Sequence, residues 1–277
     1  EKKMANIRQT ILPPVRVYQV DGLQSVCYMS LDDSGRLFVG DGMGRVVSTN
    51  THGNNALISL GSLPDNCVVH HTVRNGVVYY TYWNGETCGI KKKAPNANST
   101  DFIIQNDDEH GTEWKPISIH ASRINEDILI GMTAKKGAVG RVIRCNSAGT
   151  KQREIFQDND GQHVYRYPRY ITEPSNGHIW VSDSDNNAIK IEADRRYPGA
   201  ADPGFGPKGI CTDVDDHIIV CVANKVQLFD TDVQQLRVLP VDNEGDNASI
   251  SVCVDRDRFL HVGYSNSNVV KVYKYLE

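Results

Sequence analysis

The sequence lacks the features that mark several large classes of protein. No apolar run approaches the roughly 18–20 residues that a membrane-spanning helix needs. No stretch keeps the roughly 3.6-residue apolar period of an amphipathic helix, which argues against a mainly helical fold. No glycine-rich loop joins a strand pattern to a helix pattern, so nucleotide hydrolysis at such a loop has no support.

Paired cysteines are also missing. The seven cysteines are an odd number, none forms a Cys-x-x-Cys pair, and several, such as Cys221, lie in apolar strand-like runs. This usage is typical of buried free thiols in a reducing compartment rather than of a disulfide framework. We therefore expect a cytoplasmic protein. The polar residues after Glu1 predict no signal peptide, and the initial Glu indicates a piece of a longer polypeptide.

A strong charge imbalance is absent as well. The 277 residues include 30 Lys and Arg and 34 Asp and Glu, which gives a formal net charge of −4. Such a balance gives no whole-molecule attraction to nucleic acid or to acidic membranes, although a local basic patch is compatible with it. The length is sufficient for one large all-β domain or for two smaller domains.

The sequence does contain a repeat along its whole length. A polar turn is followed by two apolar residues and then by a third apolar residue, here called the anchor, as in Gly177-His178-Ile179-Trp180-Val181, where the anchor is Val181. Successive anchors are 41, 50, 51, 39 and 42 residues apart. This is the period of four-stranded propeller blades, about 40–50 residues. The six anchors are Val39, Tyr80, Ile130, Val181, Val220 and Val262.

Each copy is predicted to contain an inner strand before the anchor strand and a third strand after it. A fourth, outer strand is expected in most copies, for example at 102–105 and 154–156. The fourth copy is expected to have an irregular crossing at 195–199 instead of an outer strand. The sixth copy ends without an outer strand, and residues 15–20 supply a spare one that closes the ring.

The predicted fold is therefore all-β, a six-bladed β-propeller closed by an N-terminal strand in the last blade. Residues 1–13 are expected to be an N-terminal extension and residues 14–277 the propeller. A pair of β-sandwiches or a stack of small barrels is the alternative, but six similar units with a spare strand fit those architectures poorly.

The fourth copy carries the most specific motif. An inner strand begins at Pro168, a Gly-x-Ile-Trp-Val-x-Asp stretch runs from Gly177 to Asp183, and a turn containing Asn187 follows. This pattern resembles the NHL repeat. The first and sixth copies match more weakly, and the fifth has Val222 where the motif has Asp. The aspartate is suited to accept hydrogen bonds from turn amides, and asparagine tolerates the left-handed conformation of such a turn.

The resemblance implies a binding module. NHL propellers commonly form the C-terminal target-recognition part of tripartite-motif ubiquitin-ligase proteins, where some bind single-stranded RNA and others bind proteins. The expected function is thus non-enzymatic recognition of a protein or peptide target through one propeller face. Single-stranded RNA is the alternative partner. A membrane partner and a small-molecule cofactor are not expected.

One rim of the ring is the expected binding face, since loops from all six blades meet there. Basic residues gather on blades three to five, and counting back twelve residues from two anchors places Arg169 and Lys208 side by side at the channel mouth. Trp83, Trp114, Tyr167 and Tyr264 are the predicted rim aromatics. The candidate ligand-binding residues are Trp83, Lys115, Lys135, Lys136, Arg166, Tyr167, Arg169 and Lys208.

Three interpretations of this rim stay open. It is a solvated loop surface, an anion or nucleic-acid site in which rings stack on bases, or a protein-binding patch anchored by aromatic residues.

Catalysis has weaker support than binding. His70 and His120 both lie ten residues before their anchors and are predicted to be equivalent positions in inter-blade packing rather than metal ligands. Cys211 and Cys253 are predicted to be equivalent in the same way. Asp213 and its neighbours resemble turn formers more than a calcium site. A metal-dependent propeller hydrolase is therefore an unfavoured alternative, and neither a catalytic nor a metal residue is assigned.

Overall fold

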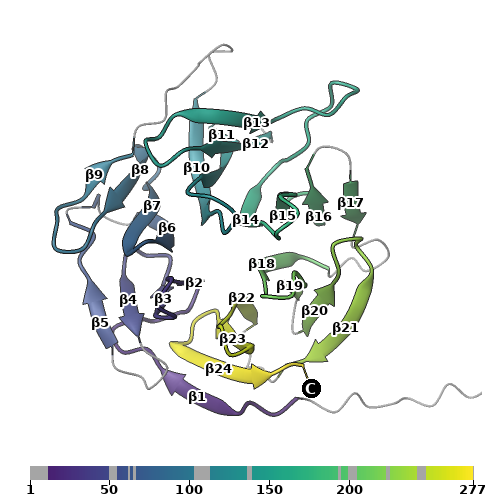
Figure 1. The fold of residues 1–277 in the computed structure, drawn as a ribbon. Coiled ribbons are helices and arrows are strands. Elements are labelled where there is room, and N and C mark those ends of the chain that lie inside the picture. The colour runs from purple at the N-terminus through teal and green to yellow at the C-terminus, as the bar shows by residue number, and fades with distance from the viewer. Residues whose placement is uncertain are drawn as a thin grey trace, which may run out of the picture.

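The protein is a six-bladed β-propeller in a computed structural model (Figure 1). The structure describes residues 12–49, 55–61, 63–64, 67–102, 113–135, 139–192, 195–198, 205–222, 225–241 and 248–276. Six four-stranded antiparallel sheets surround a central axis, and the first strand of each blade lies nearest that axis. No helix in these ranges is long and apolar enough to cross a membrane.

The first three blades follow one another along the chain. Blade one contains β2 (Tyr28–Leu31), β3 (Leu37–Gly40), β4 (Val46–Thr49) and β5 (Asn55–Ile58). Blade two contains β6 (Val68–Arg74), β7 (Val77–Trp83), β8 (Cys88–Lys93) and β9 (Thr100–Asp101). Blade three contains β10 (Trp114–Ala121), β11 (Ile128–Ala134), β12 (Gly140–Cys145) and β13 (Lys151–Ile155).

The last three blades complete the ring. Blade four contains β14 (Pro168–Thr172), β15 (Trp180–Asp183), β16 (Ala188–Ile191) and β17 (Arg195–Pro198). Blade five contains β18 (Pro207–Thr212), β19 (Ile218–Val222), β20 (Lys225–Phe229) and β21 (Gln235–Pro240). Blade six contains β22 (Ser249–Val254), β23 (Phe259–Tyr264), β24 (Val269–Lys274) and, from the N-terminal side, β1 (Arg16–Gln19).

The predicted closure by an N-terminal strand is confirmed. β1 pairs antiparallel with β24 and lies along the outside of the last blade in Figure 1. The Val15 amide donates to the Val272 carbonyl at 2.8 Å, and the Val20 amide donates to the Asn268 carbonyl at 2.8 Å. The two ends of the propeller are therefore held in one sheet, which leaves no open seam between the first and last blades.

The six anchors form the centres of the blade cores. Each lies on the second strand of its blade, and all six are 0% exposed. Each pairs with an inner-strand residue, as Val181 does with Ile171 and Val262 with Val252. The repeat in the sequence thus corresponds to one register position that recurs in every blade.

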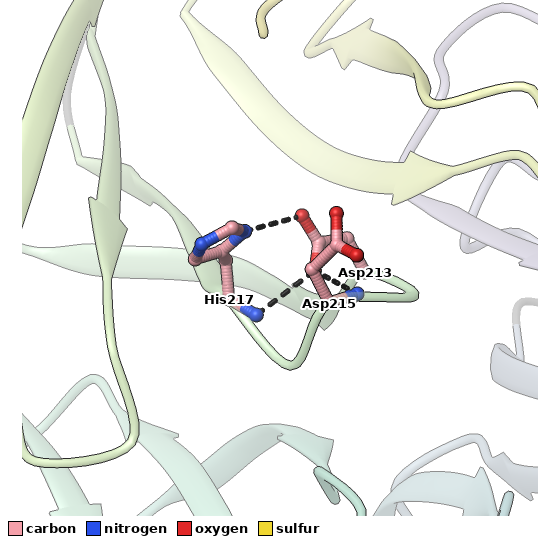
Figure 2. A group of neighbouring side chains, drawn as sticks. All are labelled: Asp213, Asp215 and His217. Carbon is pink, nitrogen blue, oxygen red and sulfur yellow. Dashed lines mark hydrogen bonds and ion pairs between the residues drawn. The ribbon is translucent and has the colours of Figure 1, made fainter.

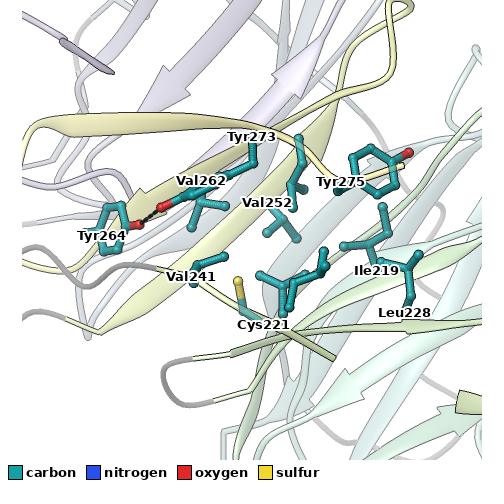
Figure 3. Close-up of a cluster of buried hydrophobic side chains, with 12 residues drawn as sticks. Ile219, Cys221, Leu228, Val241, Val252, Val262, Tyr264, Tyr273 and Tyr275 are labelled. Atoms are coloured by element: carbon teal, nitrogen blue, oxygen red, sulfur yellow. Dashed lines mark hydrogen bonds between the residues drawn. The ribbon is translucent and has the colours of Figure 1, made fainter. Parts of the chain in front are cut away.

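The hydrophobic core lies mainly between neighbouring blades. Figure 3 shows the cluster between blades five and six, in which Ile219 and Leu228 face Val252 and Val262. Neighbouring inner strands approach so closely that a Cβ on Gly209 would lie 2.7 Å from the Cα of Ser251. Small residues on the inner strands therefore hold the six strands tightly around the axis.

The outer strands differ from the prediction in two blades. The expected irregular crossing in blade four is wrong, because β17 pairs with β16 from Ile191↔Arg195 to Ala188↔Pro198. An edge strand forms backbone hydrogen bonds to a neighbour on one side only. Two arginines and a terminal proline in β17 therefore do not prevent its pairing with β16. In blade two the outer strand is β9 rather than 102–105, and residues 103–105 lie outside the described ranges.

Replacing Tyr18 with proline tests the closure. Tyr18 precedes Val20 by two residues in the same register, opposite Val270, so its amide faces β24 as that of Val20 does. We expect Tyr18→Pro to have a free energy of unfolding about 1–3 kcal/mol lower than Tyr18→Thr, through the lost ladder hydrogen bond. Urea unfolding measures the difference. Tyr18→Thr is the matched control because it loses the same ring, and equal stability of the two variants contradicts the closure.

Candidate functional site

The central channel has two different ends. The inner strands β2, β6, β10, β14, β18 and β22 begin at one face, here called the entry face, and end in tight turns at the other, here called the turn face. The loops that lead from one blade to the next lie at the entry face, where the sequence placed the binding site. The side chains of the inner strands decide what each end of the channel offers.

Three aromatic rings close the channel near the entry face. Tyr28, His70 and Tyr170 come from blades one, two and four and are here called the aromatic plug. The Tyr28 ring centroid lies 3.8 Å from that of His70 and 5.4 Å from that of Tyr170. The Tyr170 hydroxyl donates to the Cys27 carbonyl at 3.2 Å, which links blade four to blade one across the axis. At the same level the other strands carry Ser118, Gly209 and Ser251, so there is room for the three rings.

Three cationic side chains lie beside the plug. Lys115, Arg169 and Lys208 are each the second residue of an inner strand, β10, β14 and β18, and are here called the mouth cluster. All three are half-buried. None forms an ion pair with a carboxylate in the part of the chain that the structure describes. The register supports the predicted neighbourhood of Arg169 and Lys208, since each directly precedes the plug-level residue of its strand in neighbouring blades.

The electrostatics of the mouth cluster follow from partial burial. Burial lowers the pKa of Lys208, and the positive charge of Arg169 lowers it further. Burial also lowers the pKa of Lys115, whose ammonium lies 3.4 Å from the centre of the Trp83 ring. The pKa of His70 is held well below its ordinary value by burial and then by the charge of Arg169, so this imidazole is neutral. The cluster is an unneutralised positive site.

The remaining candidate residues lie at different distances from this cluster. Trp83 is half-buried under Lys115, and the half-buried Tyr167 lies close enough to Arg169 for that charge to lower its pKa against the raising effect of burial. Arg166 is exposed. Lys135 is exposed and lies 3.4 Å from the carboxylate of Glu113, so it is already paired. Lys136 lies outside the described residues.

Two predicted rim aromatics belong to the core instead. Tyr264 is 0% exposed, and its hydroxyl is 3.1 Å from that of Tyr273 inside the cluster of Figure 3. The prediction that Tyr264 is an interface anchor is therefore wrong, because β23 extends through it and turns the ring inward. Trp114 is half-buried, with Arg141 4.2 Å above its ring and Phe156 packed edge-on against it.

The aspartate of the fourth repeat organises the entry loop. Asp183 is fully buried, and its two carboxylate oxygens accept hydrogen bonds from the backbone amides of Arg166 and Tyr167, both at 2.9 Å. The amide nitrogen of Asn186 donates to the same carboxylate at 2.6 Å. This is the turn-capping role expected from the motif, and it fixes the loop that leads into Arg169.

A blind cavity of about 370 Å³ occupies the channel on the far side of the plug. Tyr28, His70, Ser118 and Arg169 line its end at the plug, whereas exposed residues such as Arg123, Val214 and Arg256 line it at the turn face. One residue from each inner strand forms a ring at mid-depth, here called the mid-channel ring. Its members are Ser30, Thr72, His120, Thr172, Cys211 and Cys253.

The histidine equivalence expected from the sequence is wrong. His70 pairs with Thr81, one residue after its anchor, whereas His120 pairs with Leu129, one residue before its anchor. Counting residues fails here because the hairpins differ in length: the anchor and its inner-strand partner are 9 residues apart in blade two (His71↔Tyr80) and 11 apart in blade three (Ile119↔Ile130). Cys211 and Cys253 are equivalent, as predicted, because each pairs with the residue before its anchor.

The one group of potential metal ligands found in the described ranges is Asp213, Asp215 and His217 (Figure 2). Asp213 accepts from the amides of Asp215 and His217 at 2.9 and 2.8 Å, from His217 Nδ1 at 2.9 Å and from the Tyr275 hydroxyl at 2.7 Å. Asp255 makes the same pattern with its own turn. These aspartates are turn formers, as the sequence predicted.

Comparisons with known proteins identify the fold. No model of a protein family and no curated protein matches the sequence. Among solved structures, an inactive virginiamycin B lyase from Staphylococcus aureus with quinupristin has a TM-score of 0.63 at 15% identity, over 93% of this chain and 98% of that one. A gluconolactonase from Xanthomonas campestris gives 0.68 at 13%, over 93% and 89%.

A third similar structure is regucalcin, a calcium-binding protein from Agrobacterium tumefaciens, with a TM-score of 0.64 at 12% identity over 91% of this chain and 86% of that one. Identities this low establish the six-bladed propeller and nothing about activity.

Sequence reasoning missed the plug, the mid-channel ring and the arginines of the turn face. The signal was present in the alternation of the inner strands, where every second side chain faces the channel and the next blade. Bulges between Pro168 and Tyr170 and between Ser249 and Ser251 shift that alternation, so it could not be followed by counting alone.

Three buried neutral histidines predict acid sensitivity. Burial lowers the pKa of His71 to about 4 and that of His120 to about 3, and it lowers the pKa of His70 as well. Unfolded histidines titrate near the ordinary value of 6.5. Below pH 6.5 the unfolded state therefore binds more protons, so the stabilisation present above pH 6.5 is lost as the pH falls toward 4.

His71→Gln isolates one of these contributions. Relative to the wild type, we expect the loss of unfolding free energy between pH 7.0 and pH 5.5 to be smaller by about 1.2 kcal/mol. Urea unfolding at the two pH values measures it. The lower absolute stability of the variant does not matter, because only the pH dependence is compared. An identical pH dependence contradicts the assignment of a buried neutral imidazole.

Proposed function

We propose that this propeller is a non-catalytic recognition module that binds an acidic segment of a protein partner at the mouth cluster. The observation that carries the proposal is the convergence of Lys115, Arg169 and Lys208 on one end of the channel without a carboxylate partner in the described chain. Half-buried charges interact more strongly with an incoming anion than fully solvated ones, because the local dielectric is lower.

The number of cations favours a protein partner over RNA. Non-specific RNA binding needs a groove of basic residues that follows several phosphates. Here three cations gather at one end of the channel rather than along a groove, and Lys135 is paired with Glu113. One aspartate, glutamate or C-terminal carboxylate matches such a compact site, with Tyr167 and Trp83 as neighbouring aromatic contacts. The overall charge of −4 also gives no general attraction to nucleic acid.

Single-stranded RNA is the second candidate, favoured by the same two aromatic rings beside the cations. A base stacked on Tyr167 with its phosphate at Arg169 and Lys208 is the corresponding arrangement.

The absence of catalysis is part of the proposal. Burial raises the pKa of the Cys211 and Cys253 thiols well above the ordinary value, so both stay protonated. The imidazole of His120 is neutral and far below its ordinary pKa because of burial. Near neutral pH neither thiol is therefore an activated nucleophile, and His120 is not an effective general base.

We further propose that the module is an NHL propeller of a tripartite-motif-like ubiquitin ligase and that it acts in the cytoplasm. The capping role of Asp183 in the fourth repeat supports the first part. The seven free cysteines support the second.

Charge reversal at Lys208 tests the proposed function. Partners captured from a cell lysate by the wild-type chain are expected to be reduced at least tenfold with Lys208→Glu, because a carboxylate then faces the acidic segment. Lys274→Glu is the matched control, because Lys274 is more exposed than Lys208 and lies outside the mouth; this variant should retain the captured partners. Quantitative mass spectrometry of the captured proteins measures the effect.

Treating the lysate with ribonuclease separates the two partner classes. Captured proteins that persist after treatment support direct protein binding, whereas their loss together with bound RNA supports the second candidate. The same partners retained by Lys208→Glu and by the wild type refute the mouth cluster as the site.

A further inference from the structure

We propose that the blind cavity on the turn face is a second binding site, which takes a small organic acid with an apolar body and one carboxylate or sulfonate group. Lys115 and Lys208 of the mouth cluster do not line this cavity, whereas Arg169 lines it at the plug. The charged groups of the proposed site, Arg123 and Arg256, lie at the opposite end, so the site does not rest on the proposed recognition function.

The size and shape of the cavity suit a small molecule. Its volume of about 370 Å³ lies within the range of ligand pockets, which is roughly 300–1,000 Å³. Tyr28, His70 and Tyr170 close its inner end, and Ser118, Gly209 and Ser251 fill the rest of that level. A molecule that enters from the turn face is thus surrounded by all six inner strands, with the plug and Arg169 at the far end.

The walls combine apolar surface with unsatisfied polar atoms. Val73, Val214 and Val254 contribute apolar surface near the open end. In the mid-channel ring, Ser30 Oγ and His120 Nε2 are buried and have no hydrogen-bond partner within the described residues. Such orphaned atoms cost free energy unless a bound group or water satisfies them. A hydroxyl or carbonyl on the body of the ligand is suited to this role.

The rim of the turn face supplies the charge. Arg123 reaches from blade three across to blade five, where its guanidinium donates to the Thr212 carbonyl at 2.7 Å. Arg256 lies on the same rim in blade six. Neither forms an ion pair with a carboxylate in the described ranges, whereas the neighbouring Arg74 is paired with Asp33 at 3.3 Å.

The acidic groups of this rim are already engaged. Asp32 and Asp255 accept the amides of their own turns, and Asp215 is paired with Arg258 at 2.9 Å. Two arginines are therefore left to face an anion at the entrance. Guanidinium groups bind carboxylates and sulfonates in a bidentate manner, which places the anionic group at the rim and the apolar body inside.

Binding of 8-anilinonaphthalene-1-sulfonate tests this assignment, since the probe joins an aromatic body to one sulfonate. We expect saturable one-site fluorescence enhancement. Arg256→Gln should weaken binding about tenfold, which corresponds to the loss of one charge-assisted contact. Arg258→Gln, which removes a nearby arginine that does not line the cavity, should change affinity less than twofold.

Filling the cavity is the decisive variant. Ser30→Phe should abolish probe binding, and Ser30→Ala, which removes only the hydroxyl, should retain it. If Ser30→Phe loses the near-ultraviolet circular dichroism of the native fold, Cys211→Leu serves the same purpose. Lys208→Gln on the entry face should leave the affinity unchanged. Absence of saturable binding, or unchanged affinity after filling, overturns the proposal.

Discussion

The close packing of neighbouring inner strands is the constraint on which the other features depend. In two blade junctions the same contact recurs, because Ser118 Oγ donates to the Pro168 carbonyl at 2.6 Å and Ser251 Oγ donates to the Val26 carbonyl at 2.8 Å. Each hydroxyl ties one inner strand to the start of the next. These contacts hold neighbouring inner strands in a fixed register, and the pairing of β1 with β24 closes the ring around them.

This register explains why residues far apart in the chain lie together. Arg169 and Lys208 are neighbours because each directly precedes the plug-level residue of its strand, Tyr170 or Gly209. Lys115 lies three residues before Ser118, further toward the entry face. One level further in, large rings on three strands and small residues on the other three complete the plug. The plug lies between a cationic mouth at the entry face and a cavity at the turn face, and Arg169 lines both. The two ends therefore have different chemistry.

The period of the anchors was sufficient to predict the fold, because every anchor is a fully buried residue on a second strand. The closing strand was predictable for the same reason, since blade six had no outer partner of its own. Counting also located Arg169 and Lys208 near one another. These successes share a cause: the inner and second strands obey strict packing rules that the sequence must satisfy.

The failures have physical causes too. The edge strand β17 was missed because pairing on one side leaves little trace in side-chain pattern. Hairpins of unequal length displaced His120 from the level of His70. Tyr264 was assigned to a loop, although β23 extends through it into the core. A channel cavity depends on which alternate side chains face the axis in all six inner strands at once. No local sequence pattern specifies this.

The most direct measurement of the central claim is the structure of the propeller in complex with a segment of a captured protein. The account predicts an acidic side chain or C-terminal carboxylate within hydrogen-bond distance of both Arg169 and Lys208, with the segment crossing the entry face near Tyr167. A segment bound to the outer strands or to the turn face, with the mouth cluster untouched, contradicts it.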